Sequence, residues 1–322
     1  MSEGISRRRL LVTGAVAGLG LLAWQHPRIK HLLARMRPTT AKRLGYPADA
    51  RLVIIHADDI GFAGSVNAAT IAAFDRGAIS SGSVMVTCPK FPEFAAWART
   101  RPRLDVGLHL TFVSERPAVR WGPVSPVERV PSLVDSSGYF PRRWSVDAPV
   151  RPSEVETEVR AQIARAREFG LRLTHLDSHQ SYLALKSAEV FDVLLRVARE
   201  ERLPFRVAHS WLKSKPYLRE AEGSTVILDR LVDISPNAAT TETWTAWYVE
   251  RVKGLRPGVS EVLVHPGYDD PELRAMTADD PLWGSAWRQA DFDAVTSPAF
   301  AAALREVGAN VITWRQLGSL IA

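Results

Sequence analysis

Acidic residues and histidines follow several short apolar runs in this chain of 322 residues. The run Leu52–Ile55 leads directly into His56 and then into the adjacent carboxylates Asp58 and Asp59. Two carboxylates at the end of a buried strand are costly unless a metal ion, another cation or a reaction compensates their loss of water. One Asp would be enough to cap the helix that follows, so the pair favours a functional site over a simple cap.

Histidines stand at the ends of three further apolar runs. They are His109, the pair His175 and His179 around Asp177, and His265. One Asp with two His is a common ligand set for a divalent metal ion, and it leaves a coordination position open for water. A second carboxylate can accept a proton from that water, and a further His can return one to a leaving group. A lone His at such a place is more often a core residue, but this combination favours metal-assisted hydrolysis.

The hydrophobic pattern predicts strands that alternate with helices and position these residues. Strands are expected at 52–55, 83–87, 105–110, 173–179, 205–207, 225–228, 261–264 and 310–313, and helices at 65–76, 92–101, 154–169, 188–201, 242–253 and 297–307. Residues 114–150 and 268–292 are expected to be long loops. The alternation is typical of an α/β fold with a mainly parallel sheet, whose active site lies at the carboxyl ends of the strands.

Charge and cysteine content exclude some classes of function. The net charge is +6, but residues 1–43 hold nine Lys or Arg against one Glu, which leaves a net of −2 on the rest. That part of the chain therefore has no basic field for nucleic acid. Cys88 is the single cysteine, so an internal disulfide and a cysteine-rich zinc site are excluded. Its apolar neighbours favour a buried structural thiol.

The N-terminal segment has the layout of an export signal. Arg7, Arg8 and Arg9 precede an apolar run that ends near Trp24, and paired arginines fit the twin-arginine type. The run is shorter than the ~20 residues of a membrane span, and no small-x-small cleavage motif follows it. We expect a signal or membrane anchor at 1–24, a linker at 25–50 and one domain at 51–322. The protein would then be periplasmic or otherwise extracytoplasmic, or anchored to the membrane through this segment alone. A cytoplasmic protein with a basic amphipathic start is the alternative.

The chemical motifs resemble, in type, order and spacing, those of the YdjC/ChbG carbohydrate deacetylase family. The matching segments are His56–Gly61, Gly107–Leu110, Thr174–Gln180, His265–Gly267 and Val295–Ser297. The resemblance covers about residues 51–318. It implies a (β/α) barrel-like fold, a distorted TIM-type barrel of mainly parallel strands. It also implies metal-dependent hydrolysis of the N-acetyl group of an amino sugar or oligosaccharide, with release of acetate.

The same resemblance implies roles for individual residues. Asp59, His109 and His179 would bind one divalent metal ion, Mg or Zn. Asp58 would be the general base toward water, and His265 would protonate the leaving amine or orient the base. Four further residues would support the ligands or contact the substrate; they are Asp177, His175, Gln180 and His56. For His175 a purely structural role is an equal alternative.

The chain departs from the family pattern at three positions. His56 stands where family members usually have Asn, and Ser181 and Leu183 stand where the third motif often continues with His. Together with the export signal, these changes point to a different acetylated substrate, such as an envelope or lipid-linked glycan. Two alternatives stay open: a metal-dependent hydrolase of another amide or ester, and a non-catalytic glycan-binding relative. A homo-oligomer is compatible with the sequence.

Tryptophans supply a further indication of a sugar ligand. Seven lie in or beside predicted loops and helix starts: Trp121, Trp144, Trp211, Trp244, Trp247, Trp283 and Trp287. The apolar C–H faces of sugars stack on aromatic rings, so some of these side chains could line a binding pocket. The alternative is that most of them pack beneath the long loops.

Overall fold

The computed structural model describes residues 39–145, 147–181, 183, 186–221, 225–233 and 240–321. The expected signal at 1–24 and most of the expected linker lie outside these ranges. In the described residues, none of the helices has the length and apolar character needed to cross a membrane. Helix α3 (Thr40–Arg43) buries Ala41, and Tyr46 packs beside it. Residues 39–50 therefore pack on the folded body.

Parallel strands form the centre of the molecule. The larger sheet has the order β4-β3-β2-β1-β8-β7, and β9 pairs with β1 beside β2. Its strands are β1 (Arg51–Ile60), β2 (Ser81–Val84), β3 (Val106–Leu110), β4 (Leu176–Ser178), β7 (Arg230–Val232), β8 (Gly258–Val264) and β9 (Ala309–Val311). Every pairing is parallel. The central position of β1 explains its continuous apolar run, because both of its faces are buried.

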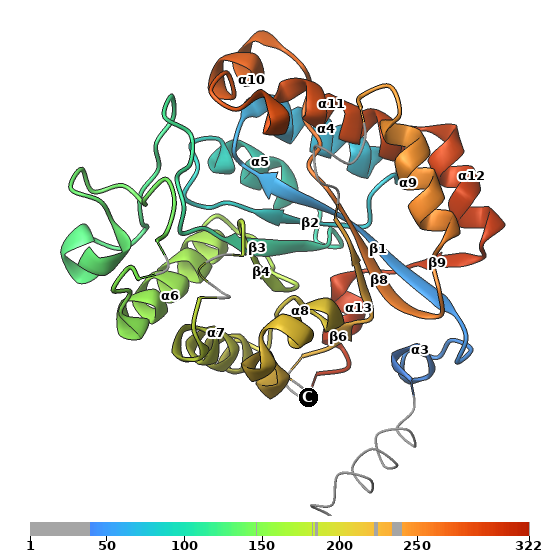
Figure 1. The fold of residues 1–322 in the computed structure, drawn as a ribbon, viewed down its shortest axis with the longest axis horizontal. Helices are drawn as coiled ribbons and strands as arrows, with labels where there is room; N and C mark the ends of the chain where they lie inside the picture. Colours follow the sequence, from blue (N-terminus) through green and yellow to red (C-terminus); the bar gives the residue numbers. More distant parts are fainter. Residues whose placement is uncertain are drawn as a thin grey trace, which may run out of the picture.

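A second, two-stranded sheet continues the curvature. It consists of β5 (Val207–Ala208) and β6 (Ile227–Leu228). A bridge between Leu176 and Phe205 joins it to β4, and the Asp229 N–H donates to the Val259 carbonyl of β8 at 2.9 Å. The strands thus curl into a distorted barrel with helices around it (Figure 1). The predicted (β/α) barrel-like fold with mainly parallel strands is confirmed.

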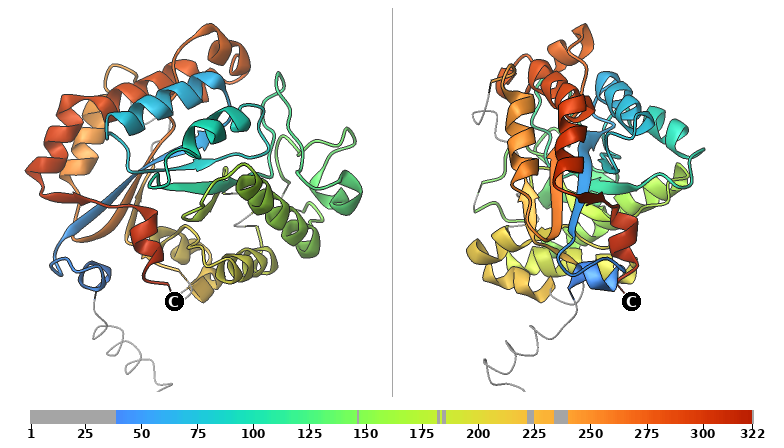
Figure 2. Two further views of the ribbon diagram at one scale, coloured as in Figure 1. Left: turned by 180° about the vertical axis from the view of Figure 1, so that it is seen from behind. Right: turned by 90° about the vertical axis from the view of Figure 1, so that its right-hand side faces the viewer.

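Helices cover the strands on two flanks. On one flank are α4 (Gly64–Asp75), α5 (Phe91–Ala98), α9 (Trp244–Lys253), α10 (Pro271–Met276), α11 (Ser285–Thr296) and α12 (Pro298–Glu306). On the other are α6 (Pro152–Glu168), α7 (Ala188–Glu200) and α8 (His209–Ser214), and α13 (Trp314–Gly318) lies near the C-terminus (Figure 2). Short 3-10 turns are η1 (Val127–Arg129), η2 (Pro131–Leu133), η3 (Pro216–Ala221) and η4 (Pro281–Trp283).

The expectation of a loop at 268–292 is wrong. This stretch forms α10, η4 and most of α11. Asp270 caps α10 by accepting a hydrogen bond from the Leu273 N–H, and Pro271 occupies the first turn. In α11 the buried face includes Arg288 and Asp291, so the apolar periodicity of a helix is broken. In the described residues of the other long connection, 114–145 and 147–150, the regular structure consists of η1 and η2, as expected.

Candidate metal and catalytic site

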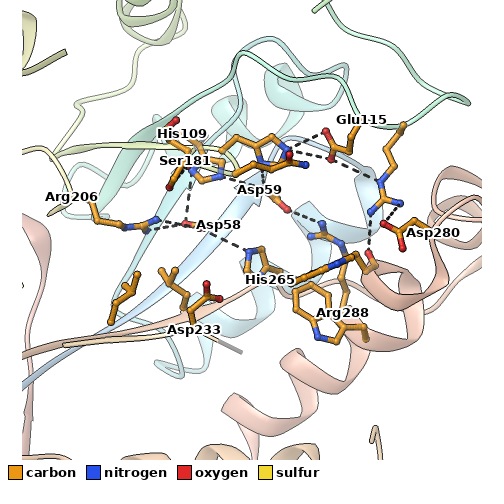
Figure 3. A pocket seen from close by; sticks show the side chains of 18 of the residues that line it. Asp58, Asp59, His109, Glu115, Ser181, Arg206, Asp233, His265, Asp280 and Arg288 are labelled. Atoms are coloured by element: carbon orange, nitrogen blue, oxygen red, sulfur yellow. Dashed lines mark hydrogen bonds and ion pairs between the residues drawn. The ribbon is translucent and has the colours of Figure 1, made fainter. Parts of the chain in front are cut away.

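The three predicted metal ligands come together at the carboxyl ends of the strands. Asp59 lies at the end of β1, His109 on β3 and His179 directly after β4. Asp59 Oδ1 is 2.9 Å from His179 Nδ1 and 3.3 Å from His109 Nε2. One potential ligand atom from each residue lies within 4.8 Å of the other two, and all three side chains are buried. Figure 3 shows Asp59 and His109 in this group.

The donor set fits a divalent cation. Asp59 Oδ1 is buried, and it forms ion pairs with the two imidazoles beside it but meets no donor in hydrogen-bond geometry. Asp59 also has a φ of +64°, an uncommon conformation for a residue with a Cβ, and such strain is typical of functional sites. Its Oδ2 accepts a hydrogen bond from Arg288 Nη2 at 2.7 Å, which fixes the carboxylate. A cation would supply the partner that the buried Oδ1 lacks.

Carboxylates hold the far nitrogen of both histidines. His109 Nδ1 is 2.7 Å from Asp177 Oδ1, so Nε2 is the nitrogen directed at Asp59. His179 Nε2 is 3.2 Å from both oxygens of Glu115, so Nδ1 is the nitrogen left for a metal. Outer carboxylates of this kind orient metal-binding imidazoles and set their tautomers. Asp177 thus lies where a supporting role was predicted for it, whereas Glu115 was not predicted.

Asp58 lies beside the ligand group and contacts two cationic side chains. Arg206 donates to it through Nη2 at 2.9 Å and Nη1 at 3.2 Å, and His56 Nε2 lies 3.0 Å from Oδ1. Burial by itself raises the pKa of Asp58, but the charges of Arg206 and His109 outweigh this effect and hold the pKa well below its usual value. Asp58 is therefore ionised, and its Oδ2 lies 4.0 Å from His265 Nε2 (Figure 3).

His265 follows β8 and is fixed by a buried carboxylate. Its backbone N–H donates to Asp291 Oδ2 at 2.7 Å, and its Nδ1 lies 3.7 Å from the same oxygen. Trp244 Nε1 and the Tyr248 hydroxyl both donate to Asp291 Oδ1, at 2.7 and 2.9 Å. The imidazole packs against the Trp287 ring with centroids 4.9 Å apart. These contacts direct the His265 ring toward Asp58.

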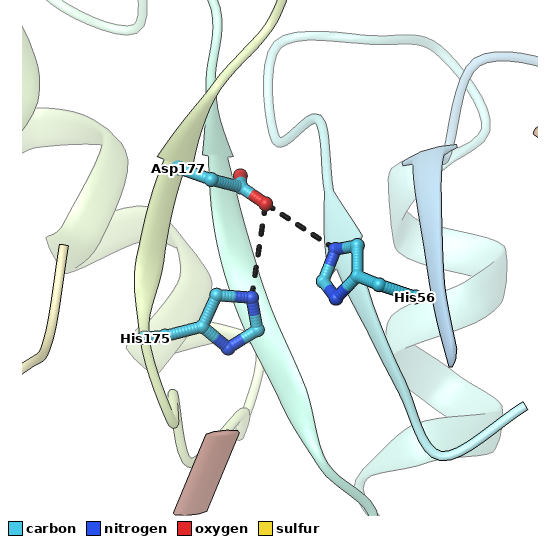
Figure 4. Close-up of side chains that lie close together, drawn as sticks. All are labelled: His56, His175 and Asp177. Carbon is cyan, nitrogen blue, oxygen red and sulfur yellow. Dashed lines mark ion pairs between the residues drawn. The ribbon is translucent and has the colours of Figure 1, made fainter. Parts of the chain in front are cut away.

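A second group of possible ligands is an internal ion cluster. His56 Nε2 and His175 Nε2 lie 3.3 and 3.7 Å from Asp177 Oδ2, and all three residues are fully buried (Figure 4). Arg206 Nη2 already lies 2.8 Å from this oxygen. Burial and the Arg206 charge lower the pKa of His56, but hydrogen bonds to Asp177 and Asp58 raise it to about 9. The cationic side chains of Arg206 and His56 therefore balance the charge of Asp177. His56 and His175 lie behind the ligand group and contact Asp177, which holds His109.

The functional groups open into a cavity of about 520 Å³. Asp58, Asp59, His109, His179 and His265 all line it. Gln180 and Ser181 line it too, each with a positive φ, and substrate contact by Gln180 stays a prediction. Leu183 is instead packed in the hydrophobic core and is not among the residues that line the cavity.

Sequence reasoning missed several residues of the site: Glu115, Arg206, Asp233, Arg288 and Asp291. A signal did exist for Arg206, because a lone charge stands inside the predicted strand 205–207. Glu115 sits in a loop directly after β3, where a carboxylate is unremarkable. Arg288 and Asp291 lie on the helix that was expected to be a loop, so their inward direction could not be foreseen.

Metal binding is expected to release protons. Burial lowers the pKa of both ligand histidines, but Asp58 and Asp177 raise that of His109 to about 10, and Glu115 and Asp59 raise that of His179 to about 9. Metal ions bind neutral imidazole, so about two protons should leave per cation at pH 7, and affinity should increase between pH 7 and 9. Calorimetry in buffers of different ionisation enthalpy measures this release. Binding without proton release at pH 7 would contradict the protonated state of the metal-free site.

The same pKa values predict how the stability of the metal-free protein varies with pH. The charged histidines stabilise the fold fully below pH 6.5, the pKa of an unperturbed His, and this contribution is lost as the pH rises through 9 to 10. Bound metal should remove most of this dependence, because it replaces the protons. Unfolding of the metal-free and metal-loaded protein from pH 6 to 10 checks both statements.

Comparison with known proteins identifies the family of the chain. The profile of the YdjC-like protein family matches residues 52–306. A protein of Thermus thermophilus named carbohydrate deacetylase is 32% identical over 283 residues, covering 85% of this chain and 96% of the relative. One of the same name from Geobacillus stearothermophilus is 28% identical over 278 residues, covering 84% and 99%.

A crystal structure gives the same result for the fold. It is that of an Enterococcus faecalis protein named for cellobiose-phosphate cleavage, with 30% identity and a TM-score of 0.72. The match covers 85% of this chain and all of that one. Since the family profile spans most of the chain and includes every residue of the cavity described above, the chain belongs to the YdjC-like family.

Proposed function

We propose that this protein is a metal-dependent deacetylase that hydrolyses the N-acetyl group of an amino sugar or oligosaccharide and releases acetate. The observation that carries the proposal is that one cavity holds both a possible set of metal ligands and two further groups suited to proton transfer. Asp59, His109 and His179 form a possible ligand set, while Asp58 and His265 line the same cavity outside this set, with Asp58 Oδ2 4.0 Å from His265 Nε2. Relatives named carbohydrate deacetylase support the substrate class.

The three ligands would hold one divalent cation, for which Mg and Zn are the leading candidates. When bound, the cation withdraws electron density from the amide carbonyl and acidifies water, so that a carboxylate of low pKa suffices as the base. Asp58 suits this task because Arg206 and His56 keep it ionised and fix its direction.

Proton transfer follows from the placement of Asp58 and His265. Asp58 accepts a proton from water as the water oxygen forms a bond to the amide carbon. His265 lines the same cavity 4.0 Å from Asp58, and it donates a proton to the amide nitrogen as the C–N bond breaks. Water and amide thereby become acetate and a free sugar amine. Asp291 holds His265 in place, because its Oδ2 accepts a hydrogen bond from the His265 backbone N–H and lies 3.7 Å from the imidazole Nδ1.

A panel of substrates tests the proposal. The metal-loaded protein would be offered N-acetylated oligosaccharides and envelope glycans beside other acetylated amides and esters, with acetate measured directly. We expect acetate from the acetylated sugars. Acetate from a non-sugar amide or ester alone would show a hydrolase of another specificity. Binding of sugars without any acetate would show a non-catalytic relative, for which Asp58 and His265 would have no purpose.

We also propose that the protein is exported, since arginines precede a short apolar run in residues 1–24. This segment would account for any contact with a membrane. Fractionation of cells that make the full chain tests this, because the protein should be absent from the cytoplasmic fraction.

A further inference from the structure

The structure separates the seven tryptophans into two groups. Trp121, Trp144 and Trp244 direct their indole N–H groups inward, to the carbonyls of Val113 and Phe112 and to Asp291. Trp247 lies on α9 against Tyr248 and Arg251. The remaining three line the cavity; they are Trp211, Trp283 and Trp287. Four of the seven tryptophans thus pack within the protein, as the alternative interpretation of the sequence expected, and the other three lie where a ligand could contact them.

Two of these three form a path outward from His265. Trp287 packs against His265 at 4.9 Å, and Trp283 packs edge-on against Trp287 at 4.7 Å. Trp287 is buried, whereas Trp283 is 37% exposed beside Leu282, which is 55% exposed. A sugar whose nitrogen faces His265 would therefore meet Trp287 first, and the next ring would meet Trp283.

Unpartnered donors line the same wall. Trp287 Nε1 is buried and makes no hydrogen bond. Arg116 is 3% exposed, and its Nε and Nη1 also make none, although its Nη2 donates to the Trp283 carbonyl at 3.2 Å. Buried donors without partners are rare in folded proteins, so a ligand that supplies acceptors is the natural explanation.

The charge near Arg116 favours a neutral ligand. Its Nη1 lies 3.8 Å from both Asp279 and Asp280, and its Nε lies 3.9 Å from Glu115. These carboxylates balance the guanidinium charge without forming hydrogen bonds to the two free nitrogens. Hydroxyl and ring oxygens of a sugar match such donors.

We propose that Trp283 is the stacking platform for the second sugar ring of an N-acetylated oligosaccharide, and that Trp287 and Arg116 donate to oxygens of the acetylated ring. This inference rests on the proposed function and deepens it. It assigns the preference for an oligosaccharide over a single sugar to one exposed side chain. Arg116 holds the backbone of that platform in place.

The test compares variants on an N-acetylated trisaccharide and on the corresponding monosaccharide. Trp283→Ala should lower kcat/KM on the trisaccharide about tenfold more than on the monosaccharide, mainly through a higher KM. A tenfold change corresponds to the free energy of one aromatic contact. Trp283→Phe should recover most of the loss because a ring is restored. Trp247→Ala, the matched control on α9, should leave the ratio between the two substrates unchanged.

Two results would overturn the assignment. One is an equal loss on both substrates in Trp283→Ala, and the other is an unaltered protein that uses the single sugar as efficiently as the trisaccharide. Binding of the trisaccharide, measured by titrating it into the protein and following the intrinsic tryptophan fluorescence, distinguishes this failure from failure of the proposed function. Weaker binding by Trp283→Ala in a protein that never releases acetate would support the platform and reject the deacetylase, whereas unchanged binding would reject the platform.

Discussion

Replacing Asp58 by Asn should abolish acetate release while the metal ion remains bound. The substitution keeps the shape of the side chain but removes the negative charge that accepts the proton. Loss of a general base typically costs 10²- to 10⁴-fold, and we expect a fall in kcat of at least about 10³-fold. The proposed ligands are Asp59, His109 and His179, so metal content measured after desalting should be that of the unaltered protein.

A distant carboxylate provides the control for this variant. Asp135 forms an ion pair with Arg120 at 2.8 Å, and neither residue lines the cavity. Asp135→Asn should therefore keep full activity and full metal content. Normal turnover by Asp58→Asn would remove Asp58 from the mechanism, and loss of the metal together with activity would reassign it as a ligand.

Replacing Arg206 by Met should destabilise the fold strongly. The guanidinium contacts three buried carboxylates, with Nη2 2.9 Å from Asp58 Oδ1 and 2.8 Å from Asp177 Oδ2, and Nε 2.9 Å from Glu261 Oε2. Removing one partner of a buried ion pair leaves an uncompensated charge and typically costs about 3 to 5 kcal/mol. We expect a loss of that size in the free energy of unfolding, measured by urea denaturation of the metal-free protein.

A partly exposed arginine provides a control that separates the effect of burial from the loss of an ion pair as such. Arg196 makes two hydrogen bonds to Glu156 on the surface, at 2.9 and 2.6 Å. Arg196→Met should change the unfolding midpoint far less, because water replaces the lost partner. If the two variants unfolded at the same urea concentration, Arg206 would not be the counter-charge that the buried carboxylates require.

The sequence was sufficient to predict the centre of the site. Continuous apolar runs identify β1, β3 and β8, because strands buried on both faces have little freedom in composition. Parallel strands end at the same edge of a sheet, so Asp59, His109 and His265 could be expected to meet. Asp177 lies 2.7 Å from His109, in the supporting position that the family resemblance implied for it.

The parts that could not be predicted depend on contacts between distant segments. On α11, Arg288 and Asp291 point inward and contact Asp59 and His265. Because charged residues stand on the buried face of this helix, the sequence lacks the regular apolar spacing by which a helix is predicted. The expected strands at 205–207 and 225–228 overlap β5 and β6, but β7, which pairs with β8, has only three residues and is too short to give a pattern. Glu115 acquires its role only because the loop after β3 brings it to His179.

The measurement that tests the central claim most directly is acetate release as a function of metal content. Protein stripped with a chelator would be reloaded in steps with one divalent cation, and acetate would be measured from an N-acetylated oligosaccharide at each step. We predict no release from the metal-free protein and a rise in proportion to metal, complete at one cation per chain. Full release from protein that contains no metal would contradict the account.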